Sequence, residues 1–269
     1  MVLSAPRLIQ AHGVLGLPNP LPIDPARDEL FIRAVSAEFP NRLTHQLLPA
    51  EAPPQAPYLV LASTSSQLAV SVAQADFQVG FYGDYLDDLP RGLDFVERKM
   101  KAVRAGYEAA GLSPATLGLI ATFRFSGEDL ADTPPARHIQ RNLLKADIDP
   151  EEALQDATAK VSLRVRDTYF VNLTLSNYEE RRIERPLIPG MGAIRVRPWE
   201  GTVEGVGLEL VLDINNNLEA RTKREDPVVT DEGIHAVAEL LRETGEKVGP
   251  EFAETGRVAV TALIASSAP

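Results

Sequence analysis

The hydrophobic positions of the chain follow two periodicities, one typical of strands and one typical of helices. Apolar residues alternate with small or polar ones over Leu68–Phe81 and again over Leu117–Phe125, as in strands with one buried face. Over Pro90–Ala110 the apolar spacing changes to three and four residues, which predicts an amphipathic helix. Gly111 follows directly, at a position where a left-handed residue commonly ends a helix.

Similar signals mark the elements nearer the N-terminus. Leu8–Leu17 is predicted to be a strand and Tyr58–Ser63 a second, shorter one. Between them, Asp24 is a suitable helix N-cap, Pro25 suits the first helical position, and Pro40 ends the helix. The first half is therefore expected to run strand, helix, strands, helix, strand.

The second half contains a comparable order of elements. Val161–Leu175 has two alternating stretches that predict two strands, and Val206–Ile214 is the most regular alternating segment of the chain. An amphipathic helix is predicted over Asp231–Phe252, with Thr230 at its start. Val258–Ile264 is predicted as a closing strand.

These elements predict an α+β protein with two related lobes. The lobes are residues 1–126 and 150–269, with a connecting segment at 127–149. Each lobe is expected to be a mainly antiparallel sheet backed by one principal helix, because alternating strands imply sheets with one wet face. The two sheets are either adjacent or continuous.

The helix over Pro90–Ala110 also predicts which of its side chains are buried. Met100 and Val103 belong to the apolar stripe and are expected in the core. The cationic residues outside the stripe are expected to face solvent; they are Lys99, Lys101 and Arg104. The acidic residues before the helix are interpreted as capping groups that favour its positive end; they are Asp84, Asp87 and Asp88.

Composition and charge narrow the classes of function. The 269 residues include no cysteine, which excludes disulfides, thiolate metal sites and cysteine nucleophiles. The net charge of −11 describes an acidic protein, for which strong nucleic-acid binding is not expected. Met1–Leu17 lacks the features of a signal peptide, and no apolar run is long enough for a membrane span. We therefore expect a cytoplasmic bacterial protein without a membrane partner.

Nucleotide and metal motifs are incomplete in this sequence. Gly190 and Gly192 match the first two glycines of a dinucleotide fingerprint, but Arg195 stands where the third belongs. Asp213–Asn217 resembles the start of a calcium loop, yet Leu218 replaces the required glycine. An exposed Asn-rich turn is the better interpretation of that segment. No cofactor and no bound metal are expected.

Isolated polar residues leave an enzymatic alternative open. His235 and Glu239 lie four residues apart on the predicted C-terminal helix, outside its apolar stripe, which favours a solvated face over a metal site. An active site assembled between the lobes would have to draw on dispersed side chains. The candidates are His45, His138, Asp84 and Arg124.

The segment Tyr178–Glu200 combines five arginines, four glutamates and the single tryptophan with proline-rich loops. Arginine and tryptophan are typical anchors of protein interfaces. The same arginines are also suited to clasp a phosphate or carboxylate ligand. A third interpretation is a salt-bridged connection whose tryptophan lies in the core. The interface candidates are Arg181, Arg182, Arg185, Arg195, Arg197 and Trp199.

Several segments together carry a resemblance to a known family. They read ASTSSQLAVSVAQADFQVGFYGDY, LGLIATFRFS, VGLELVLDINNN and DEGIHAVAELLRETGEKVGPEF. The pattern resembles a sporadically distributed family of uncharacterised bacterial proteins of about this size, without an assigned activity. Members tend to have an acidic residue where Gln10 or His12 falls here. The resemblance implies a two-lobed fold and an accessory role of the kind found among mobile or defence-related genes, and it supplies no catalytic residues.

Two hypotheses about function follow from these observations. The first is a non-enzymatic interaction or adaptor protein, a subunit of a prokaryotic assembly, whose contact surface is a sheet face or the Tyr178–Glu200 segment. Its partner would be another protein or a second copy of the chain. The alternative is an enzyme with a dispersed active site between the lobes and an unknown reaction type.

Overall fold

Nine strands form one antiparallel sheet in the computed structural model, which describes residues 3–40, 42–49, 51–127, 134–146, 148, 154–166, 168–182, 201–217 and 228–259. The strands are β1 (Arg7–Gly16), β2 (Arg42–His45), β3 (Leu59–Ala62), β4 (Ser66–Val70), β5 (Gln74–Gly80), β6 (Thr116–Phe125), β7 (Thr158–Val165), β8 (Tyr169–Arg182) and β9 (Thr202–Asn215). Their order across the sheet is β2-β3-β4-β5-β1-β6-β9-β8-β7, so β2 and β7 are the edges.

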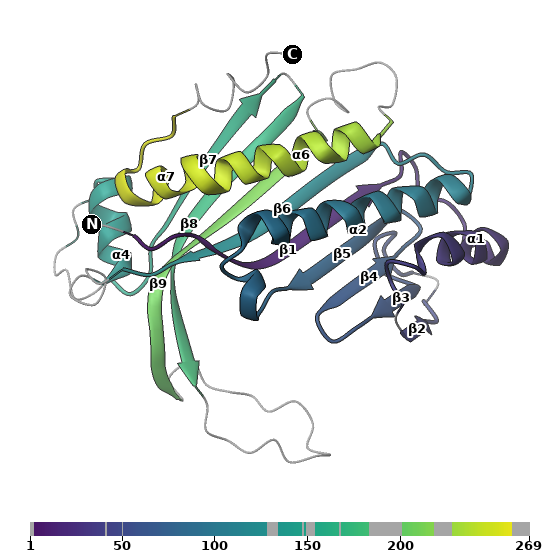
Figure 1. The fold of residues 1–269 in the computed structure, drawn as a ribbon, viewed down its shortest axis with the longest axis horizontal. Coiled ribbons are helices and arrows are strands. Elements are labelled where there is room, and N and C mark those ends of the chain that lie inside the picture. The colour runs from purple at the N-terminus through teal and green to yellow at the C-terminus, as the bar shows by residue number, and fades with distance from the viewer. Residues whose placement is uncertain are drawn as a thin grey trace.

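The main helices lie over the same face of this sheet, as Figure 1 shows for α1, α2, α6 and α7. The helical segments are α1 (Pro25–Val35), the 3₁₀ turn η1 (Gly83–Tyr85), α2 (Leu89–Ala109), α4 (Pro135–His138), the π-helical η2 (Ile139–Leu144), α6 (Asp231–Glu243), the π-helical η4 (Thr244–Val248) and α7 (Gly249–Thr255). Helices α6, η4 and α7 follow one another without a break, in agreement with the predicted C-terminal helix. Within the described ranges, no helix combines the length and apolar character needed to cross a membrane.

The core fills the space between the sheet and the helices. Strand β6 illustrates how the sequence produces it, because Leu119, Ala121 and Phe123 are buried while Ile120 and Thr122 between them are only half-buried. Successive side chains of a strand point to opposite faces, so the alternation directs one set toward the helices. The predicted alternation of this strand is confirmed.

The strands of both halves of the chain belong to a single sheet. Strand β6 pairs with β1 on one side and with β9 on the other, and both pairings are antiparallel. The expected mixture of α and β structure with an antiparallel sheet is therefore confirmed, and the sheet is continuous. The division into two related lobes with one principal helix each stays a prediction, as do the bounds 1–126, 127–149 and 150–269.

The predicted start of α1 and both predicted ends of α2 agree with the structure, whereas α1 ends at Val35 and not at Pro40. Asp24 caps α1, where its Oδ1 accepts from the backbone N of Ala26 at 3.0 Å. Asp88 caps α2 in the same way, with Oδ1 3.1 Å from the backbone N of Arg91. Gly111 follows α2 with φ of 71°, a left-handed conformation that glycine adopts without strain. The short strand β2 was not predicted, and most of the predicted strand Val258–Ile264 lies outside the described residues.

The prediction that Lys99 faces solvent is wrong. Met100 and Val103 are buried as expected, but Lys99 is buried beside them. Its Nζ donates to the carbonyl oxygen of Glu38 and lies 3.3 Å from Oε2 of the same residue. The aliphatic stem of a lysine is long enough to cross apolar surface before its charge meets a partner, which a helical wheel does not show. Lys101 and Arg104 are half-buried in ion pairs.

The expectation of an exposed Asn-rich turn after β9 is also wrong at Asn216. This side chain is buried, and its Oδ1 accepts from the backbone N of Leu117 at 2.7 Å. Its Nδ2 donates to the carbonyl oxygen of Ala115 at 3.3 Å. Asn216 thus satisfies buried backbone groups at the start of β6, which is the usual condition for burying a polar side chain.

Candidate functional site

The face of the sheet opposite the main helices carries a row of mostly polar side chains across its centre. The side chains lie opposite one another on neighbouring strands, so the strand register itself assembles the row. From β4 to β7 the row runs Gln67, Gln78, His12, Ile120, Asp213, Asn172 and Ser162. We call these residues the central row and the surface around them the open face.

One residue of the central row, His12, forms a histidine–aspartate pair. Nε2 of His12 on β1 donates to Oδ1 of Asp76 on β5 at 3.0 Å. Nε2 of Gln74 donates to the other carboxylate oxygen of Asp76 at 2.9 Å. Such a pair can orient a general base, but catalysis would need a nucleophile or substrate group within reach of the imidazole. Within the described ranges, His12 makes no hydrogen bond to a hydroxyl group.

Asp213 forms a second carboxylate cluster on the open face. Its Oδ2 accepts from Nδ2 of Asn172 at 3.0 Å, and its Oδ1 accepts from Nδ2 of Asn215 at 3.0 Å. Amide groups therefore reach both carboxylate oxygens of Asp213, whereas at Asp76 one oxygen accepts from the Gln74 amide and the other from His12. No group of three or more metal-ligating side chains is present among the described residues. The open face is thus organised by hydrogen bonds between neutral amides and isolated carboxylates.

The ends of β8 and β9 extend beyond the rest of the sheet as a two-stranded arm, which Figure 1 shows projecting away from the helices. Pairing continues along it from Tyr178 opposite Gly207 to Arg182 opposite Thr202. At its base, the guanidinium of Arg124 lies 4.4 Å from the ring centroid of Tyr178. Gly207 is required there, because a Cβ would lie 2.3 Å from the carbonyl oxygen of Phe125.

Electrostatic contacts fix Arg124 at the base of this arm. Its Nε donates to Oε2 of Glu209 at 3.0 Å, and its Nη1 lies 3.8 Å from Oε2 of Glu180. Burial is the main cause that raises the pKa of Tyr178, while the charge of Arg124 opposes it. A cation stacked on an aromatic ring therefore connects the base of the arm to the open face.

Two of the predicted interface residues lie on the arm. Arg181 pairs with Glu179, and its Nη1 donates to the carbonyl oxygen of Gly201 at 3.4 Å. Nη1 of Arg182 donates to Oε1 of Glu204 at 3.3 Å. Both arginines thus contact neighbouring groups of the arm. The other four candidates lie outside the described residues; they are Arg185, Arg195, Arg197 and Trp199.

The dispersed candidates for an active site occupy separate elements. His45 is exposed on the edge strand β2, Asp84 lies in η1, and Arg124 lies at the base of the arm. His138 is buried in α4, where Nε2 donates to the carbonyl oxygen of Ala253 at 2.6 Å and Nδ1 accepts from Asn142 at 2.7 Å. Among the described residues, no hydrogen bond or ion pair joins any two of these four candidates.

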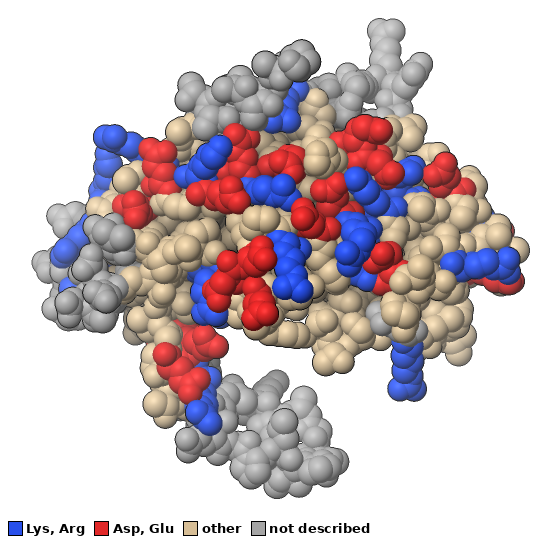
Figure 2. Space-filling model, viewed as in Figure 1, with Lys and Arg blue, Asp and Glu red and all other residues tan. Residues whose placement is uncertain are grey.

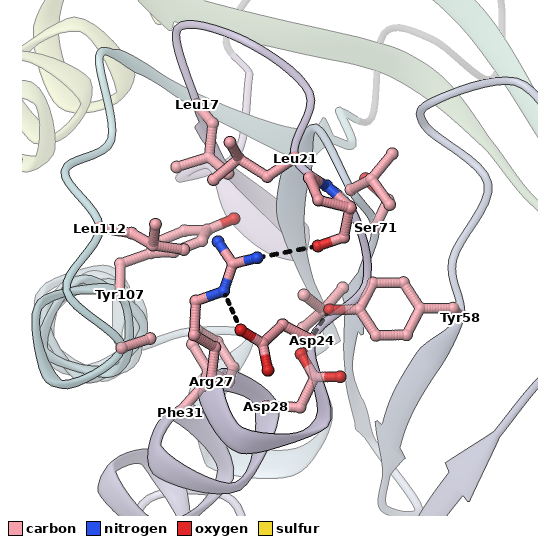
Figure 3. A pocket seen from close by; sticks show the side chains of 14 residues that line it. Leu17, Leu21, Asp24, Arg27, Asp28, Phe31, Tyr58, Ser71, Tyr107 and Leu112 are labelled. Carbon is pink, nitrogen blue, oxygen red and sulfur yellow. Dashed lines mark hydrogen bonds and ion pairs between the residues drawn. The ribbon is translucent and has the colours of Figure 1, made fainter.

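A small pocket between α1, α2 and the end of β4 is filled by its own side chains, as Figure 3 shows around Arg27. Nε of Arg27 donates to Oδ2 of Asp24 at 2.9 Å, and its Nη2 donates to the carbonyl oxygen of Pro22 at 3.1 Å. The hydroxyl of Tyr58 donates to Oδ1 of Asp28 at 2.6 Å, and burial together with this carboxylate raises the pKa of Tyr58. The remaining space is about 30 Å³, which is room for water rather than for a larger ligand.

The outer surface of the helices carries mixed charges. Figure 2 shows acidic and basic side chains interspersed over the helices on this face, with no continuous basic stripe. Ion pairs join α2 to α6 there: Nε of Arg104 lies 2.6 Å from Oδ1 of Asp231, and Nδ1 of His235 lies 3.1 Å from Oε1 of Glu97. The prediction that His235 belongs to a solvated face is confirmed, since its side chain is exposed.

Comparisons with known proteins name no family for this chain. No family model matches the sequence, and no curated protein is significantly similar to it. The family likeness therefore stays an expectation from the residues quoted above, and the function has to be inferred from the open face and the arm.

Proposed function

We propose that the protein is a non-enzymatic interaction protein, a subunit of a larger assembly, and that it contacts its partner through the open face and the adjoining arm. The observation that carries this proposal is the one-sided helical layer of the sheet. Helices pack against one face of the nine strands, and the opposite face presents the central row. Antiparallel sheets tolerate one solvated face, and that face is then available for contacts.

The chemistry of the open face supports contact with protein. Its polar groups are mainly neutral amides and hydroxyls, such as Gln10, Gln78 and Thr122, which donate and accept hydrogen bonds. Branched apolar side chains such as Ile120 and Val211 lie half-buried among them. Protein interfaces combine apolar contact with about one hydrogen bond per 100–200 Å² in this way.

The test is affinity purification of the tagged chain from its host, repeated with variants of defined faces. Gln78→Arg introduces a long cationic side chain at an exposed position of the central row. Glu108→Arg makes a comparable change on the outer side of α2, where the glutamate side chain is largely exposed. We expect one partner to co-purify in fixed proportion with the unmodified chain and with Glu108→Arg, and to be lost with Gln78→Arg.

Thermal unfolding of both variants provides the control. Neither position is part of the core, so both variants should have the melting temperature of the unmodified chain. A partner that remains bound to Gln78→Arg would contradict the assignment of the open face. If the unmodified chain is recovered without any co-purifying protein, the adaptor function itself is contradicted.

A further inference from the structure

The edge strand β2 has main-chain groups that point away from the sheet. The backbone N of Gln46 donates to the carbonyl oxygen of Tyr58, which directs the main chain of Gln46 toward β3. Residues of an antiparallel strand alternate between bonding one neighbour and the other, so Thr44 also bonds toward β3. Leu43 and His45 therefore direct their N–H and C=O groups outward, where the sheet order places no further strand among the described residues.

The pairing of β3 with β4 leads independently to the same assignment. The backbone N of Ser63 donates to the carbonyl oxygen of Ser66, so the odd-numbered residues of β3 bond to β4. Its even-numbered residues then bond to β2, and Val60 faces Thr44 in the register. Among the residues that the structure describes, the outward main-chain groups of Leu43 and His45 therefore have no strand to pair with.

An apolar groove of about 700 Å³ lies directly beside this edge, between α1 and β2. Leu43 and His45 lie opposite the buried residues Leu61 and Leu59, so their side chains are on the helix side and line the groove. Its apolar lining residues are Ile23, Pro25, Ile32, Leu43, Leu47 and Leu48. Ile23 is 50% exposed and Leu47 is fully exposed, so the groove presents adjoining apolar side chains to solvent.

The groove and the free edge require the same occupant. A strand that pairs with Leu43 and His45 would direct every second side chain to the helix side, into the groove. The ionisable groups that line the groove are Asp28, Glu29 and His45, so the groove carries two carboxylates and no lysine or arginine. The carboxylate of Glu29 is 71% exposed, and its Oε1 accepts from Nη2 of Arg33 at 2.8 Å. Such a solvent-exposed pair contributes little stability, so a basic side chain of a bound segment can share this carboxylate. These groups favour a segment with basic side chains, and they oppose a second copy of this acidic chain.

We propose that β2 and this groove bind an extended segment of a partner protein, with apolar and basic side chains at alternate positions, which adds a strand to the sheet. The bound segment hydrogen-bonds to Leu43 and His45, places its apolar side chains between α1 and β2, and sets a lysine or arginine near Glu29. This site lies on the helix side of the sheet edge, and it does not depend on the proposed function of the open face.

Binding of a synthetic peptide to the full chain tests the site directly, by fluorescence anisotropy. The probe is Thr-Lys-Thr-Val-Thr-Val-Thr-Lys, which presents lysine and valine on one side of a strand. His45→Pro removes one outward N–H, and an outward-facing edge position accepts proline without breaking the ladder. We expect this variant to weaken binding about tenfold, as the loss of one or two hydrogen bonds would. His45→Ala is the matched control and should bind within about twofold, because main-chain recognition is unchanged.

Two modified probes keep the test independent of how the variants fold. Methylation of both valine nitrogens removes the donors that would pair with β2, and it should abolish binding to the unmodified chain. Replacing both lysines of the probe with glutamate should weaken binding about threefold or more, and Glu29→Lys should reverse that preference.

Three results would overturn the proposal. The first is no detectable binding of the lysine–valine probe, and the second is equal binding of the methylated probe. The third is a homodimer in sedimentation that His45→Pro converts to monomer, which would identify a second copy as the occupant. None of these results bears on the partner that the open face is proposed to contact, which is measured by Gln78→Arg.

Discussion

Nζ of Lys99 lies 3.3 Å from Oε2 of Glu38, and the lysine side chain is only 10% exposed. The ammonium also lies 4.7 Å from the ring centroid of Phe39 and 5.1 Å from that of Phe95. Burial lowers the pKa of Lys99, while its contacts with Glu38 oppose that effect. This pair joins α2 to the chain that follows α1, so a charged residue takes part in holding the helical layer together.

Lys99→Ala should therefore destabilise the fold, by about 1–3 kcal/mol, because it leaves Glu38 short of a partner and removes the stem that packs on the rings. Arg33→Ala on α1 is the surface control, since both side chains of its ion pair with Glu29 are 71% exposed. Its cost should stay within about 0.5 kcal/mol. Urea unfolding measures the free energy of unfolding of both variants. Equal losses would contradict the role of Lys99 in holding the helical layer.

The contact between β1 and α2 gives a second prediction. Met100 is buried, and a Cβ added at Gly13 would lie 2.1 Å from its sulfur. Met100→Ala should cost about 2–5 kcal/mol through the cavity that it leaves. Gly13→Ala should cost about 1–3 kcal/mol by overpacking.

The double variant should be less destabilised than the sum of the two single variants, because each change makes room for the other. Free energies of unfolding for the four chains provide the cycle. A cost near zero for Met100→Ala, or strict additivity, would contradict the packing of β1 against α2 described here.

The stability of the fold should fall in acid. Burial by itself would raise the pKa of Glu38, but hydrogen bonds from Lys99 and Arg98 outweigh it and leave the pKa below the ordinary value of 4.5. A carboxyl group with a lowered pKa in the folded state contributes stability above its unfolded pKa, and that stability is lost as the pH falls through the folded pKa. The pKa of Glu97 is also lowered: burial would raise it, but Lys101 and His235 outweigh that effect. Its protonation should therefore destabilise the fold in acid as well.

Unfolding in urea at a series of pH values from neutral into this acidic range measures the effect. The unmodified chain should lose stability as the pH falls below about 4.5. Glu38→Gln should be less stable at neutral pH and should lose less on acidification, since it has no carboxylate to protonate. If the acid loss of Glu38→Gln equals that of the unmodified chain, Glu38 is not a source of the pH dependence.

Nucleic acid should bind weakly or not at all. Non-specific affinity comes mainly from cations that replace condensed counterions on the phosphates. The chain has 38 acidic against 27 basic residues. On the arm, Arg181 and Arg182 are each paired with a glutamate.

A titration with random duplex and single strands near physiological salt, followed by anisotropy, is the measurement. We expect no micromolar binding. Micromolar or tighter binding that Arg181→Ala weakens would show that the arm is a basic surface after all.

The positions of most helices and strands were predictable from the sequence because their signals are local. Alternation over Leu117–Phe125 and three-to-four spacing over Pro90–Ala110 identified β6 and α2 within a residue or two. Asp24 and Asp88 cap the starts of their helices through backbone groups two or three residues away, and Gly111 follows the end of α2. Such contacts depend on spacing along the chain, which the sequence states directly.

The neighbours of each strand, and therefore the candidate sites, were decided by tertiary structure alone. Alternation shows which side chains share a face, but it does not show that β1 lies between β5 and β6 or which face the helices cover. His12 and Asp76 are 64 positions apart in the sequence, and they meet only because the fold places β1 beside β5. The unpaired edge at His45 and the burial of Lys99 likewise depend on what the fold places, or does not place, beside them, and such non-local contacts leave no periodic signal in the sequence.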